Sequence, residues 1–246
     1  MHNLGPNSAE AGATAQVPAV FERALAGLAA VELRPELDRE LLPAPRRLAS
    51  FSYAGSVAVL SGAGAGSEGE EIGSGRFVLL YEPDGHPEWQ GVFRCVTLIQ
   101  VDLETEIAED RLLPEVAWSW LTEAFERRGA RFAALGGTVS QCASTRFGDL
   151  AQQPPAEDQG ARGSAARSVD PGDRGGAPEP IEHSLELRAS WTPLIQADPG
   201  GLGVSAEDAF AAIPAHFRAW TDLLTAAAGL PPVLAGVSSL PGGQRH

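Results

Sequence analysis

The alternation of apolar and polar residues in the first part of the chain predicts one helix followed by three strands. Pro18 suits the first turn of the helix, and Phe21, Leu25 and Leu28 recur at the spacing of one helical face. The prolines that follow favour an extended connection rather than a second helix. The strands are predicted at residues 51–60, 75–82 and 89–104, the last two joined by a hairpin turn.

The last of these strands has apolar residues in both of its phases. Phe93, Cys95 and Ile99 alternate with Val96 and Leu98, so neither face is consistently polar. Such a pattern is typical of a central strand that is covered on both faces, at least in part.

Two further helices are expected in the second half of the chain. One lies within residues 105–129, with Pro114 in its first turn and Gly129 just after its end. The other is started or kinked by Pro214 and ends at Gly229. Ser205 and Asp208 form a capping pattern before it.

Two strands lie between these helices. Residues 131–147 read as a strand with a bend or bulge at Gly136-Gly137, and residues 181–193 alternate between an apolar and a polar face. Residues 151–180 between them have few large apolar side chains, so this insertion is expected to be disordered. The element order α-β-β-β-α-β-β-α therefore predicts an α+β fold, with a mainly antiparallel five-stranded sheet and three main helices.

A single domain is expected over residues 17–232, with disordered tails at 1–16 and 233–246. The net charge of −14 argues against a nucleic-acid partner, because all basic residues are Arg and acidic residues outnumber them, 32 to 18. No apolar stretch is long enough for a membrane span, and the N-terminus does not have the pattern of a secretory signal. With only two cysteines, a cytoplasmic protein is the simplest interpretation, and its oligomeric state stays open.

No motif in the sequence predicts catalysis, a metal site or a cofactor. Metal-ligand spacings, a nucleophile elbow and a complete phosphate loop are all missing. Cys142 and His183 could form a thiol-imidazole couple if their strands pair, but a small buried cysteine beside a strand-end histidine is the favoured interpretation. The sequence therefore favours a non-catalytic protein.

Tryptophan and arginine supply the candidate binding residues, because both are frequent anchors of binding surfaces. Trp191 follows an apolar stripe that core packing would also explain, whereas Trp89 and Trp118 are candidates for a groove. The full candidate set is Trp89, Arg94, Glu115, Trp118, Arg188 and Trp191.

Two functions remain open on these residues. The first is a protein-binding or adaptor domain that uses one face of the sheet and the Trp118 edge. The alternative is a small-molecule-binding protein or an enzyme with a pocket between sheet and helices, where Glu115, Arg94, Arg188 and His183 would converge.

Several unusual strings also resemble a known family. The segments EWQGVFRCVTL, LLPEVAWSWLTEAFERRG, GGTVSQ, LELRASWTP and HFRAWTDLLTAAAGLPP occur in this order. They are similar to an actinobacterial family known as domain of unknown function number three thousand, over about residues 18–232. The long insertion at 151–180 departs from the family pattern. The resemblance implies an actinobacterial, cytosolic protein and assigns no activity, cofactor or catalytic residue.

Overall fold

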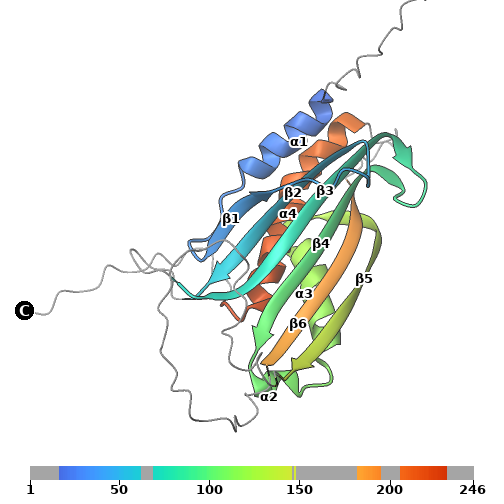
Figure 1. The fold of residues 1–246 in the computed structure, drawn as a ribbon. Coiled ribbons are helices and arrows are strands. Elements are labelled where there is room, and N and C mark those ends of the chain that lie inside the picture. Colours follow the sequence, from blue (N-terminus) through green and yellow to red (C-terminus); the bar gives the residue numbers. More distant parts are fainter. Residues whose placement is uncertain (1–16, 62–68, 146, 148–181, 195–205, 232–246) are drawn as a thin grey trace, which may run out of the picture.

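The protein is built from one antiparallel sheet with helices on one of its faces (Figure 1). The computed structural model describes residues 17–61, 69–145, 147, 182–194 and 206–231. The helices of this part are α1 (Ala19–Ala29), α2 (Thr105–Ala108), α3 (Leu113–Arg128) and α4 (Ala206–Ala227). Its strands are β1 (Leu37–Leu42), β2 (Phe51–Leu60), β3 (Glu71–His86), β4 (Gly91–Leu103), β5 (Arg131–Ser144) and β6 (Glu182–Leu194).

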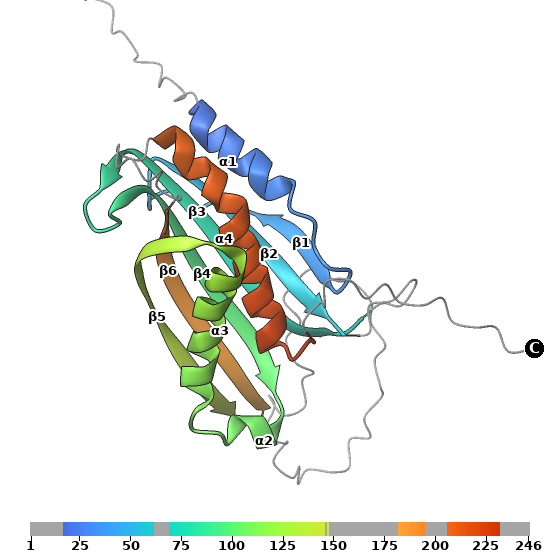
Figure 2. The same cartoon turned by 180° about the vertical axis from the view of Figure 1, so that it is seen from behind.

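The sheet has the order β1-β2-β3-β4-β6-β5, and every neighbouring pair is antiparallel. Strand β6 lies between β4 and β5, although the predicted insertion separates it from both in sequence. In the view from behind, α4 crosses the middle of the sheet, with α1 on one side of it and α3 on the other (Figure 2). The opposite face carries no helix in the described part of the chain (Figure 1).

The core fills the space between the sheet and these helices. Inward side chains of β3, β4 and β6 meet one side of α4, and Phe77 lies 5.2 Å from Phe217 and 5.3 Å from Trp220, centroid to centroid. Gly75 leaves room for this packing, since a Cβ there would lie 2.6 Å from Cζ2 of Trp220. Close packing of large aromatic side chains is therefore what joins the two layers.

The α+β class and the antiparallel sheet are confirmed, but the predicted numbers of strands and helices were wrong. The extra strand is β1, in the segment expected to be an extended connection. Its sequence, LDRELL, is short and half charged, as is common for an edge strand, which pairs on one side only. Backbone pairing with β2, from Leu37–Val59 to Leu42–Ala54, makes it a strand.

The segment 105–129 forms two helices, the short α2 and then α3, and Pro114 lies in the first turn of α3 as predicted. Pro114 has no N–H to donate to the carbonyl of Asp110, and its ring crowds that carbonyl, so a continuous helix ends there. The carboxylate of Asp110 instead accepts a hydrogen bond from the Leu112 N–H at 2.8 Å. As predicted, α3 ends at Gly129, which has the left-handed conformation with φ 61°.

Helix α4 begins at Ala206, so Pro214 lies inside it rather than at its start. The proposed cap at Ser205, the two tails and the expected insertion at 151–180 lie outside the described residues. None of the described helices combines the length and the apolar character that crossing a membrane requires.

Candidate functional site

The uncovered face of the sheet carries a row of apolar side chains at its centre. Val78, Val96 and Leu98 point away from the helices, and each is only half-buried. Strand β4 therefore has apolar side chains on both faces, although helices pack against only one of them. The sequence pattern instead predicts a strand that is covered on both faces, at least in part. Apolar side chains left open in the middle of a sheet form a surface that a partner or ligand can cover.

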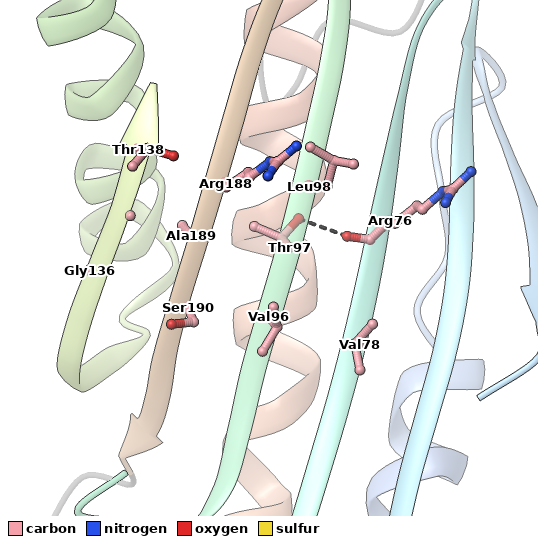
Figure 3. A pocket seen from close by; sticks show the side chains of 11 residues that line it. Arg76, Val78, Val96, Thr97, Leu98, Gly136, Thr138, Arg188, Ala189 and Ser190 are labelled. Carbon is pink, nitrogen blue, oxygen red and sulfur yellow. Dashed lines mark hydrogen bonds between the residues drawn. The ribbon is translucent and has the colours of Figure 1, made fainter. Parts of the chain in front are cut away.

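These side chains form the floor of a hollow with a volume of about 490 Å³ (Figure 3). Sheet register explains its outline, because residues paired across neighbouring strands lie side by side on one face. One row runs from Arg76 through Leu98 and Arg188 to Thr138, and the next runs from Val78 through Val96 and Ser190 to Gly136. The hollow thus spans β3, β4, β6 and β5.

Arginine side chains give the hollow a basic rim. Arg188 reaches across Leu98, while Arg76 extends toward β2 on the far side of the floor (Figure 3). The Arg188 side chain is 64% exposed, and its Nε donates to Oε1 of Glu186 at 2.8 Å. An ion pair this exposed contributes little stability, so Arg188 can exchange Glu186 for the carboxylate of a ligand at small cost.

A third arginine, Arg94, lies on the same face but supports the wall of the hollow. Its guanidinium donates to the carbonyl of Ala134 at 2.8 Å and to the Ser190 and Thr192 hydroxyls at 2.6 and 3.3 Å. Burial lowers the pKa of Arg94, because the charged form loses solvent. These bonds attach β5 to β4 and β6 where the register of β5 shifts, between Ala133 and Gly136.

Two glycines shape the border of the hollow on β5. The bulge that was predicted at Gly136-Gly137 lies just before them, between Ala133 and Gly136, and Ala134 within it has a positive φ of 48°. Gly137 lies against Trp118 of α3, since a Cβ there would come within 2.8 Å of Cζ3 of the indole. Trp118 therefore braces β5 from the helix side.

A family model described as a protein of unknown function, DUF3000, matches residues 17–172 and 161–238. The chain belongs to this family. Neither the curated proteins nor the solved structures contain a match to it.

In this DUF3000 protein the predicted binding residues are divided between the two sides of the sheet. Arg188 lines the hollow and Arg94 lies beside it. Trp118 packs on the helix side, and Glu115 is exposed in the first turn of α3. Trp89 lies in the turn between β3 and β4 and stacks on His86, with ring centroids 4.9 Å apart.

Trp191 must be corrected, because it is fully buried in the core and cannot belong to a surface site. Its apolar stripe is the helix-facing side of β6, which packs against α3 and α4. The indole Nε1 donates to Nδ1 of His216 at 3.1 Å. Burial lowers the pKa of His216 to about 4, so the imidazole is neutral at neutral pH.

The polar groups expected in a sheet-helix pocket are not brought together. Phe125 lies 5.0 Å from Trp191 and 5.5 Å from His216, so aromatic rings fill this part of the interface. The hollow lies on the other face of the sheet.

The hypothetical thiol-imidazole couple is also excluded by register. Cys142 pairs with Ser184 and Ala143 with His183, so the thiol and the imidazole project from opposite faces. Within the described ranges no group of three His, Cys, Asp or Glu side chains could hold a metal ion.

The floor of the hollow (Val78, Val96 and Leu98) and its border at Thr138 and Ser190 are not among the residues predicted from the sequence. The signal was present in the second apolar phase of β4. The pattern predicts a face that is covered at least in part, because sequence alone does not show on which side the helices pack.

Proposed function

We propose that this DUF3000 protein is a non-catalytic binding domain of the actinobacterial cytoplasm, and that its hollow takes an acidic, partly apolar segment of another protein. The observation that supports this is the apolar floor of Val78, Val96 and Leu98 between Arg76 and Arg188. Apolar contact would supply most of the affinity, and arginine would select carboxylates through paired hydrogen bonds.

The form of the hollow favours a peptide segment over a compact ligand. It is open along a sheet face that spans β3, β4, β6 and β5, so it would cover one side of an elongated segment. The described lining offers guanidinium and hydroxyl groups but no carboxylate, imidazole or thiol for proton transfer or nucleophilic attack. A binding role fits this set of groups better than catalysis.

The volume of the hollow supports a second candidate, an anionic small molecule with an apolar body. About 490 Å³ lies within the range of small-molecule sites, roughly 300–1,000 Å³. Such sites normally enclose most of the ligand surface, which a hollow on an open sheet face does not do. We therefore place the protein segment first.

The test uses a library of random twelve-residue peptides displayed on phage and selected on the full chain. Enriched peptides are synthesised and their affinity is measured by fluorescence polarisation. We expect peptides that combine apolar and acidic residues, and a loss of affinity of at least about tenfold in Val96→Asp and in Arg188→Glu.

Arg127→Glu is the matched control for charge reversal. Arg127 is an exposed arginine on α3, on the helix side of the sheet, and it also pairs with a carboxylate, that of Glu123 at 3.7 Å. Its reversal should leave the affinity within about twofold. Peptides that bind all three variants equally would place binding elsewhere, and a selection that enriches nothing would refute a peptide-binding role.

A further inference from the structure

Strand β5 forms one edge of the described sheet and, beyond its bulge at Ala134, lacks the charges, prolines and short length that protect many edges. From Gly136 to Ser144 it continues in unbroken register with β6, and all these residues except Val139 are exposed. The sequence over 132–145, FAALGGTVSQCAST, contains no charged residue and no proline. Charges, prolines and short length are the features by which natural edge strands avoid pairing with another chain.

The opposite edge shows these features. Strand β1 has six residues, with Asp38, Arg39 and Glu40 in the middle, and prolines occur close to both of its ends. Two edges of the same sheet thus differ sharply in charge and length. The difference makes β5 the edge that is open to pairing with another strand.

The two ends of β5 carry opposite charge. Arg131 starts the strand and supplies the basic charge of this end, while Arg127 and Arg128 at the end of α3 are already paired with Glu123 and Asp222. At the other end Ser144 pairs with Glu182, and the Gln141 amide donates to the Asp110 carbonyl at 3.0 Å, which brings the acidic α2–α3 connection alongside. An edge with one basic and one acidic end is complementary to itself when turned by 180°.

We infer that β5 pairs antiparallel with β5 of a second copy of this chain. The two-fold axis relating the copies crosses the paired strands at a point within the segment 136–144. The basic end of each strand then lies against the acidic end of the other. The backbone groups of the edge gain hydrogen-bond partners, and no charged side chain on 132–145 opposes the approach.

This pairing would join two sheets into one and has a consequence for the hollow. An axis perpendicular to the sheet keeps the two uncovered faces on the same side. Because Gly136, Gly137 and Thr138 border the hollow, the two hollows would lie close together across the axis. The inference does not depend on what the hollow binds.

Sedimentation velocity over a series of protein concentrations tests the pairing. The wild-type chain should form dimers, and Ser140→Lys should raise the dimer dissociation constant at least about tenfold by placing two like charges near the axis. Leu41→Lys is the matched control, because Leu41 is 72% exposed on the β1 edge and the change in charge is the same. It should leave the dissociation constant unchanged.

Cysteine cross-linking gives an independent measurement of the axis. In a Cys142→Ser background, where the remaining Cys95 is buried, the variants Thr138→Cys, Val139→Cys and Ser140→Cys are oxidised separately, and at least one should give a disulfide-linked dimer. A cysteine at Leu41 should not.

Three outcomes would overturn the inference. The first is a monomer at every concentration, and the second is a dimer that Leu41→Lys disrupts and Ser140→Lys leaves intact. The third is a monomer in which the β5 amides are protected from hydrogen exchange only when a selected peptide is added. That last result would show that a partner segment, and not a second copy, occupies the edge.

Discussion

Gly136 and Gly137 are neighbours on β5 with opposite tolerance for a side chain. A Cβ at Gly137 would collide with the backbone carbonyl of Arg188 and lie 2.8 Å from Trp118, whereas a Cβ at Gly136 would meet nothing within 4 Å. We predict that Gly137→Ala lowers the free energy of unfolding by about 2 kcal/mol through overpacking. Gly136→Ala should change it by no more than about 0.5 kcal/mol.

Urea denaturation followed by tryptophan fluorescence measures both variants. The pair is well matched, because both positions are exposed on the same strand and receive the same substitution. Equal stability of the two variants would mean that β5 can move away from α3 without cost, so that Trp118 does not brace it.

His216 makes stability depend on pH. The folded chain holds its imidazole at a pKa of about 4 by burial, against an ordinary value of 6.5. Between these values the unfolded chain takes up a proton that the folded chain does not, so stability is complete above about pH 6.5 and falls as the pH drops to 4. We predict a loss of about 3 kcal/mol over this range from His216 alone.

The difference between wild type and His216→Gln isolates this contribution from other titrating groups. Glutamine has no proton to gain, and its amide oxygen can accept the hydrogen bond from Nε1 of Trp191. Unfolding free energies measured from pH 7 to pH 4 should fall more steeply for the wild type. Parallel curves for the two proteins would contradict the predicted linkage.

At the scale of elements, the sequence predicted those whose signals are local. The stripe of Phe21 and Leu28, the end of α3 at Gly129 and the bulge beside Gly136 each follow from a few neighbouring residues. Strand β1 could not be predicted in this way, because it depends on backbone pairing with β2 and its polar pattern lacks a clear period.

The candidate site was partly predictable for the same reason. The polar phase of β6 places Arg188 on the surface, and this followed from alternation alone. The floor at Val96 and Leu98 depends on which face the helices leave open, which is decided by the packing of α4 across the sheet. For Trp191 the prediction was wrong in the opposite direction. Its aromatic side chain suggested a binding residue, but the alternation along β6 places it on the helix-facing side, in the core.

At the scale of the whole molecule, all described helices that cover the sheet pack on one side. The aromatic contacts of Phe77 and Trp191 join α3 and α4 to the sheet from that side. No described helix packs on the other side, where Arg94 links β4 to β5 and β6. Stability and the proposed binding thus depend on opposite faces.

The two ends of the segment between β5 and β6 lie next to each other, since Ser144 pairs with Glu182 in the sheet. A short turn could therefore connect these strands without disturbing their register. We predict that replacing residues 146–181 by a five-residue Gly-Ser linker preserves the fold. If the segment is disordered, as its composition predicts, the shorter loop should raise the free energy of unfolding by about 1.5 kcal/mol, because loop-closure entropy grows with the logarithm of length.

Urea denaturation of the variant, with its affinity for the selected peptides, checks this prediction. Unchanged peptide affinity together with higher stability would show that the sheet and its hollow are complete without the segment. A loss of cooperative unfolding would instead mean that residues within 146–181 contribute to the core. Since β6 is the strand between β4 and β5, any such contribution should appear first as a weaker attachment of β5.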